Sequence, residues 1–498
     1  MAKYKKYNYN QTAMVPVNLE SQITEGTIEW VIHEVIDQGV DTSIFNERFK
    51  NDDTGRSAYD PKILLKIILF GYSRGLQASR ELERACKENI IFMALACGQT
   101  PDHTTIAKFV SSMQKESILI FRDILLLCDK HDLLGGTAFA IDGCKLSSNA
   151  SKEMSGTFEQ LEKKQKRLEK QLRKMMYEHQ VNDKSQNTPN LKKKNERKFK
   201  DLTREINKIT RFLEENEPKE GKKRKEIQSN VTDNDSSLMQ TSKGTIQGYN
   251  GQILVDSQHQ IIVHADVGNS GYDDENVAPL FDGAKENLES IKSNIDLSKA
   301  AALFDSAYYS HANLEKCCSE NLDVYIPDNS FRKKDPRYNR GVTVFTIVDF
   351  EYAPDSDDYT CPAGNKLKRK TDLKRKGEKY SRLYKASPKD CMGCSYKENC
   401  LKKKTAKSRS LTVIYDKKVA EFALAMNKKM LTEEGKREYD QRIGIVEPVF
   451  ANCCIHKKFD YFLLRGKPKV NIQWLLSSMA HNLEKLLHFG GDIVFNPV

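Results

Sequence analysis

The chain has 498 residues, with 80 Lys or Arg against 69 Asp or Glu, which gives a formal net charge of +11. A hydrophobic content of 39% is enough for at least one large core and excludes a fully disordered chain. The sequence has no apolar run of membrane-spanning length, and its first residues lack the apolar stretch of a secretory signal. We therefore expect a cytoplasmic protein with no membrane partner, whose cysteines serve packing, metal binding or redox chemistry.

Residues 1–133 have a helical pattern. Apolar residues recur at helical spacing around Trp30, residues 63–70 form a strongly apolar helix, and Asp102 or Thr104 can cap a short helix that carries Ile106. Compact helices joined by short turns are typical of helix-turn-helix DNA-binding modules and also of ordinary helical domains. The candidate DNA contacts of this region are His103, Thr104 and Lys108.

Strand patterns begin after Gly136. Residues 138–141 predict a buried strand that ends in Asp142, and a hairpin is expected around 257–259. Further along, residues 301–304 repeat the first pattern, an apolar strand terminated by an aspartate, Asp305. The fold class is therefore α/β, with a mixed sheet flanked by helices.

Two lysine-rich insertions interrupt this α/β pattern. Residues 158–228 carry two apolar stripes at helical spacing, which indicate an antiparallel helical hairpin or coiled coil, or else two solvated single helices. Residues 331–415 are basic, rich in turn residues and poor in apolar residues. The lysines favour polyanion binding and are equally consistent with solvated surface.

Four cysteines lie in the second insertion, and two of them form a CxxC pair. Four thiolates in a segment that lacks an apolar core of its own suit a tetrahedral structural Zn²⁺. Free thiols and a redox pair are the alternatives. The expected zinc ligands are Cys361, Cys391, Cys394 and Cys400.

Three acids are candidates for catalysis. An aspartate that closes a buried strand points into the crevice beyond the strand, so Asp142 and Asp305 can meet at one point. Carboxylates are the ligands that Mg²⁺ prefers, and two such ions promote phosphodiester chemistry. Glu447 is a lone acid among apolar residues, with Tyr439 and Arg442 before it and basic residues after it. A strand-end turn or a helix start explains each acid equally well on its own.

Ordered motifs along the chain resemble the DDE transposases of bacterial insertion sequences, within the IS4-like superfamily and closest to the IS1182 group. The resemblance covers most of the chain, from an N-terminal helical domain to a C-terminal signature. The motifs that carry it are Tyr59 to Pro61, Phe70 to Gly75, Pro101 to Ile106, Ile141 to Leu146, Gln247 to Asn250, Ala265 to Val267, Phe304 to Tyr309, Arg442 to Phe450, Leu464 to Gly466 and His481 to Leu483.

The resemblance implies an RNase H-like catalytic core in which Asp142, Asp305 and Glu447 hold two Mg²⁺ or Mn²⁺ ions. It also implies binding and cleavage of the element's terminal inverted repeats, strand transfer into target DNA, and action as a homodimer on nucleoid DNA. A nuclease that does not join ends and a non-catalytic DNA-binding descendant are the alternatives.

One motif departs from the superfamily pattern, in which three residues separate an arginine from the catalytic glutamate and a lysine follows after six more. Here four residues separate Arg442 from Glu447, and Cys454 stands at the lysine position. We expect Lys457 or Lys458 to replace that lysine, and Tyr439 and Arg442 to contact DNA.

The expected domain organisation follows these patterns. The RNase H-like core is split by the two insertions, and the helical N-terminal region precedes it. The segments are 1–133 (helical, DNA-binding), 134–157 with 229–330 (first part of the core), 158–228 (helical hairpin), 331–415 (basic, with the cysteines) and 416–498 (C-terminal helices of the core).

Overall fold

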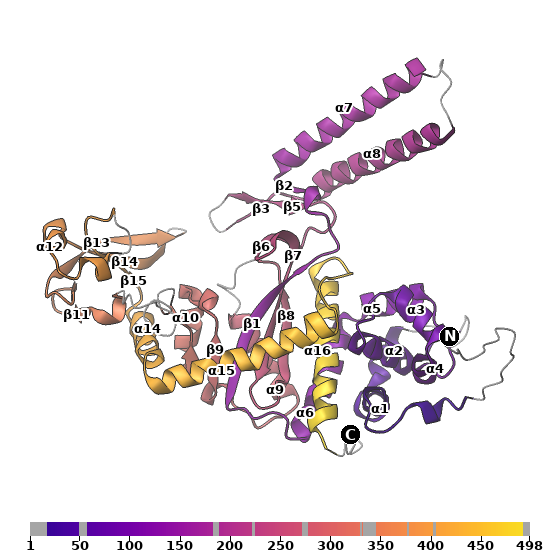
Figure 1. Ribbon diagram of the computed structural model, residues 1–498, viewed down its shortest axis with the longest axis horizontal. Coiled ribbons are helices and arrows are strands. Elements are labelled where there is room, and N and C mark those ends of the chain that lie inside the picture. The colour runs from indigo at the N-terminus through magenta and orange to yellow at the C-terminus, as the bar shows by residue number, and fades with distance from the viewer. Residues whose placement is uncertain are drawn as a thin grey trace, which may run out of the picture.

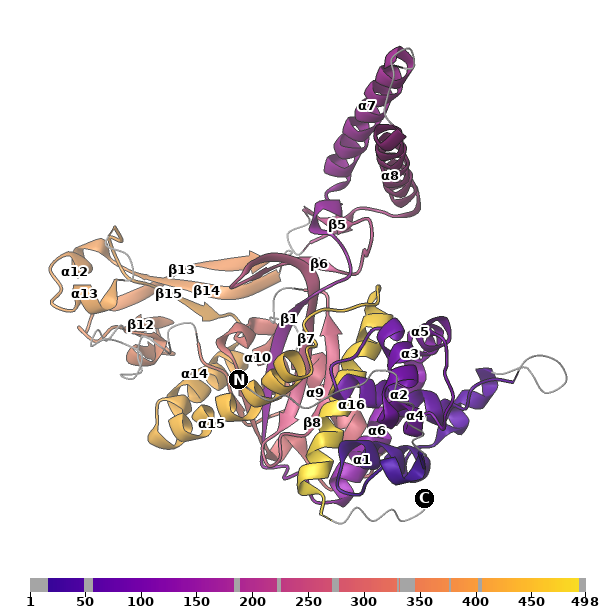
Figure 2. The same cartoon turned by 45° about the vertical axis from the view of Figure 1, so that its right-hand side comes forward.

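The computed structural model describes residues 17–48, 57–182, 189–221, 225–270, 277–328, 331, 345–375, 378–401 and 405–491. These residues form a central body from which a pair of long helices and a β-rich module project (Figures 1 and 2). The mixed α/β class and the N-terminal helical region predicted from the sequence are confirmed. Every helix in the described ranges is too short or too polar to cross a membrane.

The N-terminal helices begin at well-defined caps. Asp60 accepts a hydrogen bond from the Lys62 amide at the start of α2, and Asp102 accepts from two amides at the start of α5. Buried apolar side chains then hold the helices together. The helices are α1 (Ile28–Glu34), α2 (Pro61–Ser73), α3 (Ser79–Glu88), α4 (Ile90–Leu95), α5 (His103–Ser112) and α6 (Gln114–Lys130).

A mixed sheet forms the centre of the body. In the described residues its order is β10-β9-β1-β7-β6, with β8 also paired to β7. β1 is antiparallel to β7 and parallel to β9, so the sheet changes direction at β1. The strands are β1 (Ala138–Ser147), β6 (Ser237–Thr241), β7 (Gly244–Asp256), β8 (Ile262–Gly268), β9 (Ala301–Phe304) and β10 (Val324–Tyr325).

β1 is longer than the sequence predicts. The expectation that the strand ends in Asp142 is wrong, because β1 continues to Ser147 through its pairing with β7. The pairing of β1 with β9 does end there, at Ile141 opposite Phe304. Asp142 is thus the first residue of β1 beyond the parallel pairing, and Asp305 is the first residue after β9.

Helices cover the sheet and join it to the N-terminal region. α16 packs against β8 on one side and against α2 and α6 on the other, and its buried residues join one continuous apolar core. The side-chain nitrogen of Asn482 donates to the carbonyl of Ile262, and its side-chain oxygen accepts from the backbone amide of Ile262. This pair of hydrogen bonds ties α16 to β8. The flanking helices are α9 (Val277–Ser290), α10 (His311–Ser319), α14 (Lys417–Met430), α15 (Glu433–Phe450) and α16 (Lys467–Phe489).

The first insertion forms an arm that points away from the body (Figures 1 and 2). Its two long helices pack through their own apolar cluster, which includes Leu161, Leu168, Ile206 and Ile209. Short strands at its base pair residues 155–156 with 229–230 and 219–220 with 226–227. The elements are α7 (Phe158–Asn182), α8 (Pro189–Glu215), β2 (Ser155–Gly156), β3 (Lys219–Glu220), β4 (Glu226–Ile227) and β5 (Ser229–Asn230).

The second insertion is a β-rich module rather than a core-poor segment. Its sheet encloses a small cluster of buried side chains that includes Tyr359, Leu367, Tyr384 and Leu411. The prediction that the segment lacks an apolar core is therefore wrong, since alternate residues of its lysine-rich strands point inward. The elements are β11 (Glu351–Ala353), β12 (Asp358–Thr360), β13 (Lys366–Arg375), β14 (Glu378–Ala386), β15 (Ser410–Ile414), α12 (Pro388–Met392) and α13 (Lys397–Cys400).

Pro448 lies inside α15 and leaves one backbone carbonyl without its helical partner. Proline has no amide hydrogen, so the carbonyl of Gly444, four residues earlier, loses its usual donor. The side chain of Gln260, in the turn between β7 and β8, donates to this carbonyl at 2.9 Å. Lys485 of α16 donates to the same Gln260 side chain at 2.7 Å. Gln260 therefore fixes α15 against the sheet and α16.

Replacing Gln260 by methionine tests this anchor. The substitution keeps the length of the side chain but leaves the Gly444 carbonyl and the Lys485 amine without this partner, so we expect a loss of about 1–3 kcal/mol in the free energy of unfolding. Denaturant titration followed by tryptophan fluorescence measures it. Gln441→Ala, at an exposed site on α15, should change the free energy of unfolding by less than about 0.5 kcal/mol. Equal effects of the two substitutions would contradict the anchoring role of Gln260.

Candidate active site

Two carboxylates meet at the end of the parallel strand pair. Ile141 is opposite Phe304 in the register of β1 and β9, so Asp142 and Asp305 directly follow two aligned residues. Neighbouring strands lie about 4.8 Å apart, which brings the two side chains to one place. The negative charge of Asp305 contributes to the raised pKa of Asp142. The structure thus brings together the two aspartates that the sequence singles out.

Arg442 of α15 neutralises this pair. Its Nη1 donates to Asp142 at 3.0 Å, and its charge also interacts with Asp305. Burial raises the pKa of Asp142, while Arg442 and a hydrogen bond from the Gly143 amide lower it, and the net direction is upward. The Nε of Arg442 is buried and has no hydrogen-bond partner among the described residues. The site therefore holds two acids, one cation and one unused donor.

Glu447 lies on the same helix as Arg442 but does not complete a ligand cluster. Its side chain is exposed, whereas Arg442 is largely buried against the sheet. Glu447 stands five positions after Arg442, which places the two side chains about 140° apart around the helix axis. Nowhere in the described ranges do three His, Cys, Asp or Glu side chains form a group that can hold a metal ion.

Two thiols lie beside the acid pair. Cys144, two residues after Asp142 on β1, forms a hydrogen bond with Cys454 in the helical turn that follows α15. This bond and burial raise the pKa of the Cys144 thiol, and the nearby Asp142 raises it further. Cys454 occupies the superfamily's lysine position, and here it packs the end of α15 onto β1.

Comparison with known families gives two matches, and both describe transposases. Residues 360–487 match the family described as "Transposase DDE domain", a segment that includes all of α15. Residues 17–112 match the family described as "Transposase domain (DUF772)", which covers the N-terminal helices α1 to α5. These two domains are typical of IS1182-type transposases of insertion sequences. Placement in the IS1182 group fits both matches. No curated protein and no solved structure matches the chain.

The other predicted residues of the C-terminal signature take different positions. Tyr439 packs edge-to-face on Phe331 at 5.6 Å and borders the apolar core. Lys457 is only 2% exposed, and its amine donates to Glu484 of α16 at 2.5 Å. Lys458, by contrast, is exposed to solvent. Of the two lysines, Lys458 is therefore the one whose amine a phosphate can reach.

The predicted DNA contacts of the N-terminal region gather at the start of α5. The Nδ1 of His103 lies 2.7 Å from Glu83 of α3, so the imidazole is held by a carboxylate. Thr104 and Lys108 are exposed and lie one turn apart on the same face of α5. The side chain of Thr104 hydrogen-bonds Asp102, the cap of the helix. Lys108 is the cation on this face that extends into solvent.

The four cysteines of the β-rich module lie close together. All four line one small cavity of about 20 Å³, although no three of them meet in a metal-coordinating arrangement in the part of the chain that is described. Burial raises the pKa of the Cys400 thiol, Arg409 lowers it, and the other three thiols raise it. Arg409 is buried and donates to the carbonyl of Cys400 at 2.6 Å. The spacing in sequence thus corresponds to proximity in space.

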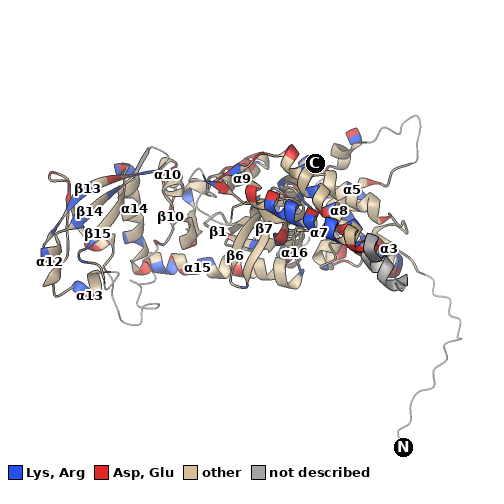
Figure 3. Ribbon diagram, turned by 90° about the horizontal axis from the view of Figure 1, so that it is seen from above, with Lys and Arg blue, Asp and Glu red and all other residues tan. Residues whose placement is uncertain are grey.

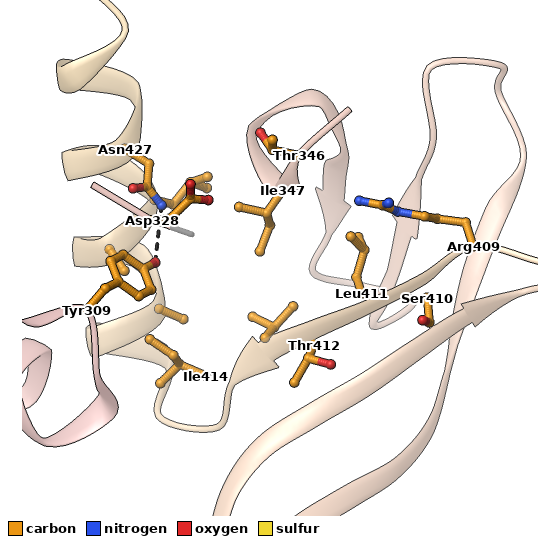
Figure 4. A pocket seen from close by; sticks show the side chains of 14 residues that line it. Tyr309, Asp328, Thr346, Ile347, Arg409, Ser410, Leu411, Thr412, Ile414 and Asn427 are labelled. Atoms are coloured by element: carbon orange, nitrogen blue, oxygen red, sulfur yellow. Dashed lines mark hydrogen bonds between the residues drawn. The ribbon is translucent and has the colours of Figure 1, made fainter. Parts of the chain in front are cut away.

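One described cavity lies away from the acid pair. It has a volume of about 370 Å³ and opens between α14 and β15 (Figure 4). Tyr309 and Asn427, which share a hydrogen bond of 3.2 Å, lie at one end, and Arg409 lies at the other. The side chains between them are mostly apolar. Since Asp142, Asp305 and Glu447 do not line it, the cavity is separate from the candidate catalytic site.

Sequence reasoning missed the residues that position α15. Gln260 sits in a turn with no motif of its own, and only Pro448 signals that a carbonyl on the helix needs an outside donor. Gln252 of β7, opposite Gly143, accepts a hydrogen bond from Tyr308. Tyr308 belongs to the second-aspartate motif, so this contact links that segment to β7, the strand that pairs with β1. Neither pairing has a spacing signature in the sequence.

Loss of Arg442 should make stability more pH-dependent. Because the pKa of Asp142 is raised in the native state, stability falls as pH rises between its ordinary value and its native value. Arg442→Ala raises the native pKa further and extends this interval. We expect the substitution to cost about 1–3 kcal/mol of unfolding free energy at pH 7, between the values for exposed and buried ion pairs, and clearly less at pH 4.

Denaturant unfolding at the two pH values, in the presence of a chelator, measures this difference. The double variant Asp142→Asn, Arg442→Ala should lose most of the pH dependence, because the titrating partner is gone. A cost that is equal at both pH values in the single variant would contradict the pairing of Arg442 with Asp142.

Proposed function

We propose that this transposase binds the terminal inverted repeats of its element and carries out metal-dependent cleavage and strand transfer at the Asp142–Asp305 site. The observation that carries the proposal is the register of β1 and β9, which aligns two acids in a chain that matches the transposase DDE domain. Strand order supports an RNase H-like core. β8, β7, β1, β9 and β10 lie side by side, with β1 antiparallel to β7 and parallel to β9.

The residues at this site fit a divalent metal. Asp142 and Asp305 supply hard oxygen ligands at one point, and Mg²⁺ typically takes one or two carboxylates together with substrate phosphate oxygens. Glu447 is proposed as the third acid because it lies in the segment that matches the transposase DDE domain; since its side chain faces away from Arg442, α15 would have to turn for it to join the pair. Two Mg²⁺ or Mn²⁺ ions, when bound, supply activation of the attacking oxygen and stabilisation of the leaving oxygen.

Arg442 has two parts in the proposed mechanism. In the free protein it balances the charge of the aspartates, which are costly to bury together. Its unpartnered Nε is a donor placed beside the acids, and a phosphodiester oxygen is the acceptor that such a donor requires. Arg442 would hold the scissile phosphate next to Asp142 and orient it for attack.

DNA contacts outside the acid pair are proposed at both ends of the chain. Lys458, beside the helical turn after α15, and Tyr439 and Lys457 from the same signature make up the C-terminal set. Because Lys457 is buried on Glu484, its part is to position this turn. His103, Thr104 and Lys108 on α5 make up the N-terminal set, in keeping with the match of that region to a transposase domain.

The division of labour follows the segments expected from the sequence. Residues 1–133 bind DNA, the sheet and residues 416–498 carry the chemistry, and 158–228 and 331–415 are accessory. We propose a homodimer on two element ends, acting on nucleoid DNA in the cytoplasm. A nuclease that cuts without joining, or a DNA-binding descendant without activity, would share the fold and the acids.

The aspartates should be needed for chemistry and not for DNA binding. In Asp305→Asn we expect Mg²⁺-dependent nicking of a terminal-repeat duplex to fall at least about a thousandfold, while its Kd changes less than about threefold, because phosphate binding is carried by cations elsewhere. A nicking assay and a gel shift measure the two. Asp296→Asn, at an exposed helix cap, is the matched control; nicking that survives in Asp305→Asn would overturn the assignment.

We further propose that Cys361, Cys391, Cys394 and Cys400 hold a structural Zn²⁺. Four thiols around one small cavity match the ligand number of structural zinc sites. Because no three of these described thiols coordinate as they stand, binding would draw them together. The bound Zn²⁺ would stabilise the module itself, since the module has only a small apolar core of its own.

Zinc removal should loosen the module and leave the acid site intact. We expect about one Zn²⁺ per chain by elemental analysis of the purified protein, and faster protease cleavage within 345–401 after chelation. Cys394→Ser should reproduce both effects, whereas Cys97→Ser, at an exposed thiol outside the module, should produce neither. A protein that contains no zinc and keeps its protease pattern after chelation would disprove the site.

A further inference from the structure

The outer face of α8 carries an uninterrupted row of cations. Lys200, Arg204, Lys208 and Arg211 are all exposed. At 3.6 residues per turn they fall within about 80° of the helix circumference and span about 16 Å along its axis. All four also border one shallow hollow of the surface, together with Asn207. The row lies opposite the apolar residues that α8 packs against α7, among them Ile206 and Ile209.

Most of this row is not neutralised within the chain. In the described residues Arg211 pairs with Glu215 at 2.8 Å, whereas Lys200, Arg204 and Lys208 make no ion pair. α7 has a similar row on its own outer face, but there Lys163 and Lys174 each pair with a glutamate. Figure 3 colours the lysine and arginine positions along the arm blue. α8 therefore presents the stronger cationic surface.

The arm is anchored to the strands that carry the acid site. The hydroxyl of Tyr249 on β7 donates to Asp233 at 2.8 Å, and the Gly466 amide before α16 donates to the same oxygen at 3.1 Å. Asn230 donates to the Ser151 carbonyl at 2.8 Å and closes the base of the arm. Since β1 runs from Asp142 to Ser147 and leads into this base, the arm begins about 17 Å along the strand from the acid pair.

We propose that the outer face of α8 is a DNA-binding surface that holds the phosphate backbone of duplex DNA beyond the cleavage site. The inference rests on the proposed function for the nature of its ligand. A row of long cations, three of which make no ion pair among the described residues, suits phosphates, which are repeated along a duplex and carry no sequence information. A second copy of the arm fits less well, because a two-fold contact between α8 faces would oppose like charges, and the apolar positions are already filled by α7.

Salt dependence of DNA binding tests the proposal. The variant Lys200→Ala, Arg204→Ala, Lys208→Ala removes three phosphate contacts, so the slope of log K against log salt should become shallower by about 2.7, at about 0.9 per contact. Fluorescence anisotropy with a labelled duplex of about 40 base pairs, between about 50 and 300 mM salt, measures the slope, and at about 100 mM the affinity should fall at least tenfold.

A matched variant removes the same charge elsewhere. Lys115, Lys130 and Lys285 are exposed on α6 and α9, outside the arm. Their triple alanine variant should keep the wild-type slope within about 0.5. Circular dichroism checks that the helices of the arm are retained in both proteins.

The outcomes separate this inference from the proposed function. A wild-type protein that binds duplex DNA, with an unchanged slope in the α8 variant, overturns the α8 surface and leaves the transposase proposal standing. An unchanged slope with loss of a dimer in sedimentation also overturns it, because the surface would then bind protein. A wild-type protein that binds no DNA at any salt concentration would remove both proposals.

Discussion

The parallel pairing of β1 with β9 is the constraint on which the candidate site depends. Four aligned pairs, from Ala138 with Ala301 to Ile141 with Phe304, bring the next residue of each strand into line. Side chains alternate between the faces of a sheet, so a slip of one residue would turn Asp142 away from Asp305 and α15. The buried apolar residues on these strands fix the register, and the register fixes the chemistry.

α15 brings the remaining groups to this point, and three contacts set its position. Gln260 holds the carbonyl that Pro448 leaves free, Cys454 holds Cys144, and Arg442 holds Asp142. The first two contacts fasten the helix to the turn after β7 and to β1. The third supplies the positive charge that two neighbouring carboxylates need in a site shielded from water. Side-chain packing, a hydrogen bond to a free backbone carbonyl and charge balance thus all act on α15.

Much of this arrangement could be predicted from the sequence, and the reasons differ from residue to residue. The strands that carry Asp142 and Asp305 are short apolar runs followed by an acid, a local pattern that survives in the fold. The cap of α5 at Asp102 and the hairpin at 257–259 are likewise local. The length of β1 could not be predicted, because residues 143–147 owe their strand conformation to β7, about a hundred residues away.

The β-rich module shows a second limit. Its strands are so rich in lysine that the inward-facing Leu367 and Tyr384 give no visible apolar pattern. For Lys457 the sequence indicates a charge near the site but not its direction, and the fold turns that charge onto Glu484. Packing also decides which face of α15 carries Glu447, and the spacing of residues in the sequence does not determine it.

Metal-directed cleavage of the protein backbone tests the central claim most directly. Fe²⁺ bound in place of Mg²⁺, with ascorbate and peroxide, produces hydroxyl radicals that cut the chain next to the ion, and mass spectrometry maps the cuts. The account predicts cuts around both Asp142 and Asp305 that disappear with excess Mg²⁺. Cuts near only one of these aspartates, or near neither, would contradict a shared metal site at the β1–β9 junction.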